Sequence, residues 1–192
     1  MSKFAITSYQ TNQKNLYPFG CINKENVLIQ HIYISNDLNI KQLDIKLATY
    51  ATINSNINNI LLKRGNDILF DIKINSKYII DNSFYHIPNL NIPIKKGDEL
   101  TISISSEDAT SGNCITAWIS NIDTKNKLFQ YNTITDRYIE KEGELVIKIN
   151  DDEDSLPIYL SNRFIHIPVK FFYALSFVLS IFTTFSVVIL LF

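Results

Sequence analysis

Residues 99–105 have the sequence ELTISIS, in which Leu100, Ile102 and Ile104 alternate with polar residues. Successive side chains of a β-strand point to opposite faces of the sheet, so this alternation predicts a strand with one buried side and one side in water. The same period of two recurs in three further segments, LDIKL (43–47), FDIKI (70–74) and ELVIKI (144–149). The sequence therefore predicts a β-rich domain.

Working outward from these segments, further apolar runs and polar turns complete the predicted domain. The runs lie near residues 27–34, 57–62, 77–87, 114–120 and 128–134, and turns are expected at 64–67 and 96–98. About eight or nine short strands at this spacing indicate an all-β, antiparallel two-sheet sandwich over residues 1–150, because one open sheet would leave its apolar face uncovered. We expect eight side chains in its core: Leu43, Ile45, Leu47, Phe70, Ile72, Leu100, Ile102 and Ile104.

The last segment of the chain has a different character. Residues 171–192, FFYALSFVLSIFTTFSVVILLF, contain no charged residue, proline or glycine. As a helix this segment would extend about 33 Å, enough to cross a hydrocarbon layer of about 30 Å. We therefore expect a single C-terminal transmembrane helix at 171–192, preceded by an acidic linker and juxtamembrane segment at 151–170.

The flanking residues suggest an orientation for this anchor. The first residues lack the apolar core of a signal peptide, and two basic residues, Arg163 and Lys170, precede the apolar segment. Basic residues favour the cytoplasmic side of a membrane. The expectation is a protein anchored in the bilayer by its tail, with the sandwich in the cytoplasm.

Two cysteines, Cys21 and Cys114, are too few for a disulfide scaffold and lack the clustered spacing of a zinc site. We favour two small buried thiols in a reducing compartment, because cysteine is among the residue types that are most often buried. A bridge between the two stays open as an alternative, because a sandwich can bring distant strands together.

The sequence lacks the patterns that accompany most catalysis. It contains no nucleophile elbow, phosphate-binding glycine loop or paired histidines at metal spacing, and the formal net charge of −1 shows no basic excess for nucleic acid. The acidic run at 150–155 is interpreted as a solvated linker rather than a calcium site. His86 lies in a strand-like run, where a structural hydrogen bond is favoured over catalysis. We expect a non-enzyme without cofactor or metal.

A small set of aromatic and polar residues forms the candidate ligand site. Trp118 is expected to pack in the core, but an exposed tryptophan could instead stack on the apolar face of a sugar ring. The residues that would serve such a site are Tyr50, Asn82, Tyr85, Glu107, Asp108, Asn113 and Trp118. Because Glu107 and Asp108 are adjacent, they would point to opposite faces of a strand and are poor partners for glycoside hydrolysis.

Three longer stretches carry a resemblance to a known family. They are LDIKLATYATINS (43–55), YIIDNSFYHI (78–87) and PIKKGDELTISISSEDATSGNCITAWIS (93–120). They resemble the accessory β-sandwich found with bacterial surface-polysaccharide glycosyltransferases and related membrane proteins, whose members look like jelly-roll carbohydrate-binding modules. The resemblance implies a jelly-roll-like fold and places Ser106, Glu107, Asp108, Asn113 and Trp118 among the positions for ligand contact.

The sequence thus supports two hypotheses of function. The first is a membrane-anchored, non-catalytic accessory or carbohydrate-binding-like module linked to cell-envelope polysaccharide synthesis, with a glycan or a glycosyltransferase as its partner besides the bilayer. The alternative is a structural β-sandwich that recruits a membrane protein through a sheet face or edge.

Overall fold

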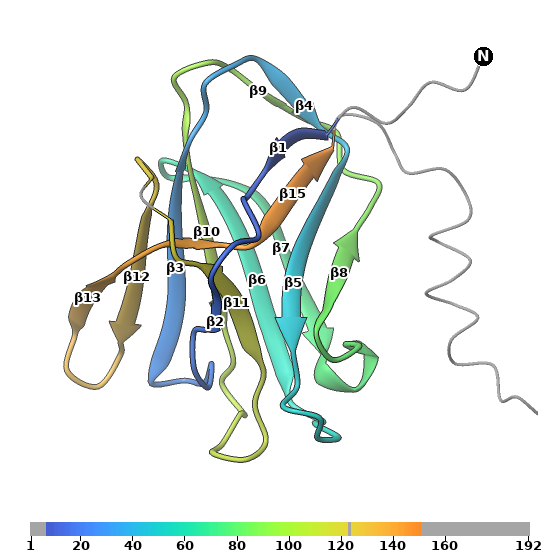
Figure 1. Ribbon diagram of the computed structural model, residues 1–192, viewed down its shortest axis with the longest axis vertical. Helices are drawn as coiled ribbons and strands as arrows, with labels where there is room; N and C mark the ends of the chain where they lie inside the picture. Colours follow the sequence, from blue (N-terminus) through green and yellow to red (C-terminus); the bar gives the residue numbers. More distant parts are fainter. Residues whose placement is uncertain (1–6, 123, 151–192) are drawn as a thin grey trace, which may run out of the picture. The chain divides into compact units, whose positions relative to one another are not determined.

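In a computed structural model that describes residues 7–122 and 124–150, two antiparallel sheets pack face to face (Figure 1). This arrangement confirms the predicted all-β sandwich. The described residues contain one helical element, a single turn of 3₁₀ helix, η1 (Ser76–Tyr78), and no helix of the length and apolarity needed to cross a membrane. The predicted linker at 151–170 and anchor at 171–192 lie outside the described residues.

One sheet has six strands in the order β13-β12-β3-β10-β6-β7. Its strands are β13 (Arg137–Lys141), β12 (Lys127–Asn132), β3 (Asn26–Tyr33), β10 (Glu99–Ser105), β6 (Ile57–Arg64) and β7 (Asp67–Asn75). Strand β10, the ELTISIS segment, lies inside the sheet between β3 and β6. Its alternation sends Leu100, Ile102 and Ile104 into the core and leaves Thr101 and Ser103 on the outer face.

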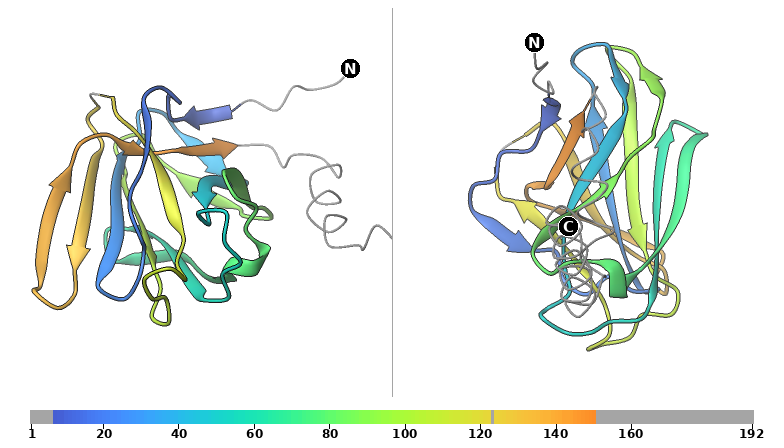
Figure 2. Two further views of the ribbon diagram at one scale, coloured as in Figure 1. Left: turned by 60° about the horizontal axis from the view of Figure 1, so that its bottom comes forward. Right: turned by 90° about the vertical axis from the view of Figure 1, so that its right-hand side faces the viewer.

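The other sheet has seven strands. They are β1 (Thr7–Gln10), β15 (Ile147–Asn150), β5 (Gln42–Ala48), β11 (Thr116–Ser120), β14 (Glu144–Leu145), β2 (Leu16–Pro18) and β8 (Ser83–Ile87). Strand β5 pairs with both β8 and β15, and β11 pairs with β2. A third, two-stranded sheet joins β4 (Leu38–Ile40) to β9 (Ile92–Ile94) at one end of the sandwich (Figure 2).

The core lies between the two large sheets. Six of the eight predicted core residues are buried, and these are Leu43, Ile45, Leu47, Leu100, Ile102 and Ile104. The other two, Phe70 and Ile72, pack against the same cluster but are only partly buried. Both belong to β7, the edge strand of the six-stranded sheet, where one side of the strand has no neighbouring strand.

The alternation in β5 predicts that Asp44 faces water, and this prediction is wrong. Its exposed fraction is 3%, although it points to the outer face of the seven-stranded sheet. His86 on β8 donates from Nδ1 to the Asp44 carboxylate at 2.8 Å, Gln42 donates at 2.8 Å and Asn150 at 3.4 Å. Side chains from β8, from β15 and from β5 itself therefore cover the carboxylate. His86 has the structural hydrogen bond that its strand position predicted.

Replacing Asp44 with alanine is expected to lower the free energy of unfolding by about 1–3 kcal/mol, because three buried or half-buried donors would lose their acceptor. Denaturant titration measures the change. The matched control is Asp71→Ala, which removes an exposed carboxylate from β7 and is expected to stay within about 0.5 kcal/mol of the parent protein. Equal losses in the two variants would contradict the role given to Asp44.

The two cysteines form a disulfide, so the favoured prediction of free thiols is wrong. Cys21 follows β2 and Cys114 precedes β11, with 5.6 Å between their Cα atoms and 93 residues of sequence separation. The bridge forms because the pairing of β2 with β11 continues past β2, where Ile22 donates its backbone N–H to the carbonyl of Ile115 at 2.9 Å. The disulfide therefore ties the N-terminal segment to the seven-stranded sheet.

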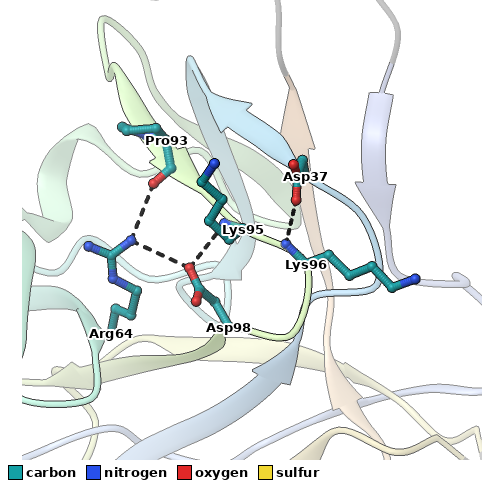
Figure 3. Close-up of polar contacts among 6 residues, drawn as sticks. All are labelled: Asp37, Arg64, Pro93, Lys95, Lys96 and Asp98. Atoms are coloured by element: carbon teal, nitrogen blue, oxygen red, sulfur yellow. Dashed lines mark hydrogen bonds and ion pairs between the residues drawn. The ribbon is translucent and has the colours of Figure 1, made fainter.

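The predicted turn at 96–98 is confirmed, and two carboxylates hold it (Figure 3). Asp98 accepts the backbone N–H of Lys95 at 3.0 Å and lies 3.4 Å from the guanidinium of Arg64, while Asp37 accepts the N–H of Lys96 at 2.7 Å. These contacts use the backbone of the two lysines. Lys95 and Lys96 are exposed, and their ammonium groups extend away from the turn in Figure 3.

Candidate functional site

Four rings lie together on the outer face of the six-stranded sheet, and we call them the aromatic face: His31, Phe129, Tyr131 and Tyr138. They come from the neighbouring strands β3, β12 and β13. Phe129 contacts His31 edge to face at a centroid distance of 5.5 Å and Tyr138 at 6.3 Å, and Tyr131 stacks on Tyr138 at 4.6 Å. These distances are typical of favourable aromatic pairs.

Strand register explains why these rings meet. Leu128 is buried, so its neighbours Lys127 and Phe129 point outward, as alternation requires. In the hairpin of β12 and β13, Tyr131 lies directly opposite Tyr138, and directly opposed side chains share one face of a sheet. The result is a continuous row of rings rather than scattered surface aromatics.

A cleft of about 600 Å³ borders the aromatic face. It is lined by His31, Tyr33, Glu99, Lys125, Lys127 and Phe129. Nδ1 of His31 lies 2.9 Å from Oε1 of Glu99 and 3.2 Å from Oγ1 of Thr101, so the imidazole is held in place by its neighbours on β10. The cleft thus combines exposed rings with carboxylate, hydroxyl and ammonium groups, which is the mixture found in sites for polar ligands.

The outermost rings are accessible. Tyr138 is 62% exposed, and Tyr33 in the cleft is 51% exposed. The hydroxyl of Tyr131 donates to Oδ1 of Asp136 at 2.9 Å, and this hydrogen bond is the main reason that the pKa of Tyr131 lies above its ordinary value. The hydroxyl proton therefore points to Asp136, and the ring presents an uncharged surface.

The structure brings together two of the residues predicted for a ligand site, Trp118 and Asn82. The indole Nε1 of Trp118 donates to Oδ1 of Asn82 at 3.0 Å. Trp118 is half-buried on the outer face of the seven-stranded sheet, so the expectation that it packs in the core is wrong. Its face is the opposite side of the sandwich from the aromatic face.

The other two predicted aromatics do not join Trp118. Tyr85 lies opposite Ile45 in the pairing of β8 with β5, and it therefore points into the sandwich, where burial raises its pKa. Tyr50 is 49% exposed in the connection that follows β5. A single sugar-stacking surface made by Tyr50, Tyr85 and Trp118 is therefore not formed.

The predicted polar residues 107, 108 and 113 lie in the connection after β10 rather than in a strand. The Asp108 carboxylate accepts the backbone N–H of Ile57 at 2.9 and 3.1 Å, and Oδ1 of Asn113 accepts that of Ser55 at 3.2 Å. Both side chains thus hold neighbouring backbone in place. Glu107 and Asp108 also line a smaller cleft of about 390 Å³, with Ile57, Asn59, Lys73, Ser105 and Ser106.

The sequence also carries a signal for the aromatic face, which the predicted ligand site does not include. Phe129 and Tyr131 are two residues apart in KLFQYN, and Tyr138 follows in RYIEK after a short polar connection. Period-two aromatics in both arms of a hairpin predict one shared face. The contribution of His31 depends on pairing between β3 and β12, which lie far apart in sequence.

No protein-family model and no curated protein matches the sequence. Among solved structures, the chain is similar to the cysteine protease and lectin-like domains of Cwp84, a surface layer associated protein of Clostridium difficile, with 6% sequence identity and a TM-score of 0.43. The similar region covers 66% of this chain and 32% of that chain. At this distance the likeness assigns neither a family nor an activity.

Proposed function

We propose that this protein is a non-catalytic module that binds carbohydrate through the aromatic face. The observation that supports the proposal is the continuous row of His31, Phe129, Tyr131 and Tyr138 beside a cleft with polar walls. A sugar ring has an apolar C–H face that can stack on an aromatic ring, and its hydroxyl groups need hydrogen-bond partners. The aromatic face and its cleft supply both.

The wider role belongs to the same proposal. The module would serve cell-envelope polysaccharide synthesis at a membrane, held there by the apolar segment at 171–192. This part rests on the sequence resemblance and on the length and apolarity of that segment. A protein partner on the same face is the competing function, because exposed aromatic groups also occur at protein interfaces.

Replacing Phe129 or Tyr138 with alanine is expected to weaken glycan binding about tenfold, which corresponds to the loss of roughly 1.4 kcal/mol of contact energy. The full chain would be purified in a detergent without a sugar headgroup, screened on a glycan array, and titrated calorimetrically with the best ligand. Thermal unfolding of each variant is expected to stay close to that of the parent, since neither side chain belongs to the buried core.

The matched control is Tyr78→Ala, which removes a ring that is 52% exposed on η1, directly after β7 at the edge of the six-stranded sheet opposite β13. Its glycan affinity is expected to equal that of the parent protein. Absence of binding to any glycan, or an equal loss in the control, would refute the proposal. A co-purifying protein that is lost only in the Phe129→Ala and Tyr138→Ala variants would favour the protein-interaction function instead.

A further inference from the structure

Two lysines lie on aromatic rings on the outer face of the seven-stranded sheet, and we call this group the lysine face: Lys46, Phe84, Trp118 and Lys148. The ammonium of Lys148 lies 4.3 Å from the ring centroid of Phe84, and that of Lys46 lies 5.9 Å from the ring centroid of Trp118. Both distances fall within the range of cation–π interactions. All four residues are half-buried, so each charge is held close to the protein surface.

Strand register places the four residues on one surface. Lys46 on β5 lies directly opposite Phe84 on β8, and Lys148 on β15 lies directly opposite Asp44, two residues before Lys46. Residues opposite one another, and those two apart along a strand, share a face of the sheet. The two ammonium groups therefore belong to one site, with a ring beside each.

Asp44 on this face and Asp81 at its end carry negative charge, and both carboxylates are hydrogen-bonded to other residues. Neither lysine forms an ion pair with any described carboxylate. Asp44 is buried beneath the face and accepts three hydrogen bonds from other side chains. At the end of the face, Asp81 accepts hydrogen bonds from Thr49 and Asn82. Within the described residues, the two ammonium groups have no carboxylate in direct contact and are available to a ligand.

We infer that the lysine face binds a saccharide that carries an acid group, either a carboxylate or a phosphate. The ammonium groups would donate charge-assisted hydrogen bonds to the acid group, and such bonds are stronger than neutral ones. The rings of Phe84 and Trp118 would contact the adjoining sugar. The inference shares the carbohydrate ligand class with the proposed function, but it concerns the opposite face of the sandwich and the charge of the ligand.

The test uses the full chain in a detergent without a sugar headgroup, titrated with oligogalacturonate, a phosphodiester-linked oligosaccharide and a neutral oligosaccharide of equal length. We expect at least one acidic probe to bind, with an affinity that falls as salt rises. The double variant Lys46→Gln/Lys148→Gln is expected to bind that probe about tenfold more weakly, because two charge-assisted contacts are lost. Preference between the two acidic probes identifies the acid group.

The matched control is Lys95→Gln/Lys96→Gln, which removes the same charge from the exposed turn of Figure 3. It is expected to bind as the parent does, and Lys46→Arg/Lys148→Arg is expected to retain binding. An equal loss in the control, or no preference for acidic over neutral probes, would overturn the inference. A failure here is told apart from a failure at the aromatic face by the two sets of variants, since Lys46→Gln/Lys148→Gln reports on the acidic probe and Phe129→Ala reports on the neutral glycan.

Discussion

Replacing both Cys21 and Cys114 with serine is expected to lower the free energy of unfolding by about 2–5 kcal/mol. The bridge spans 93 residues of sequence, and a cross-link that closes a long loop restricts the unfolded chain more than one that closes a short loop. In the folded state the bridge ties the segment after β2 to the start of β11, beside the backbone hydrogen bond from Ile22 to Ile115. Its loss would free the N-terminal strands to detach.

Denaturant titration with and without a reducing agent measures this effect. The parent protein is expected to lose stability when reduced, whereas the double serine variant should respond to denaturant identically in both conditions. Variants with only one serine would control for the substitution itself and should resemble the double variant. Equal stability of the parent and the double variant would contradict the structural role of the bridge.

The bridge also bears on the cellular location of the sandwich. Disulfides persist in oxidising compartments and are rare in the cytosol, so the oxidation state of Cys21 and Cys114 in cells would test the cytoplasmic placement that the sequence predicts. Thiol labelling of cells before and after reduction distinguishes the two locations. Cysteines that react only after reduction would favour the oxidising side, and cysteines that react at once would favour the cytosol.

The strands that alternate cleanly could be predicted from sequence because their pattern leaves one choice of buried face. In β10 all three aliphatic residues point to the same face of the strand, and all three are buried. In β8, by contrast, Phe84 and His86 alternate with Tyr85 and Ile87, so aromatic rings point to both faces of the strand. The sequence therefore could not indicate that Tyr85 faces the core while Phe84 faces outward.

The sites depended on contacts between distant segments, which single-sequence patterns do not contain. The disulfide requires β2 to pair with β11, and the lysine face requires β5 to lie between β8 and β15. Trp118 was identified as a candidate because an exposed tryptophan can stack on a sugar ring, and its contact with Asn82 brought two predicted residues together. The burial of Asp44 was missed because alternation predicts only the face of the sheet to which a side chain points. It does not predict which other side chains cover that position.

Replacing Ile102 with alanine is expected to lower the free energy of unfolding by about 2–5 kcal/mol, and the milder change Ile102→Val by about 0.5–1.5 kcal/mol. Ile102 is fully buried in β10, where it lies between Gln30 of β3 and Leu62 of β6. Both neighbouring strands hold the backbone in place, so the cavity left by alanine cannot easily collapse. The loss then includes both the removed apolar contacts and the cavity.

Ser103→Ala is the matched control for this prediction, because Ser103 is the next residue of the same strand and points to the outer face. Its effect is expected to stay within about 0.5 kcal/mol, the usual range for surface positions. Denaturant titration of the three variants against the parent protein gives the comparison. A loss in Ser103→Ala as large as that in Ile102→Ala would mean that β10 presents the opposite face to the core, and the assignment of outward-facing residues in the six-stranded sheet would be wrong with it.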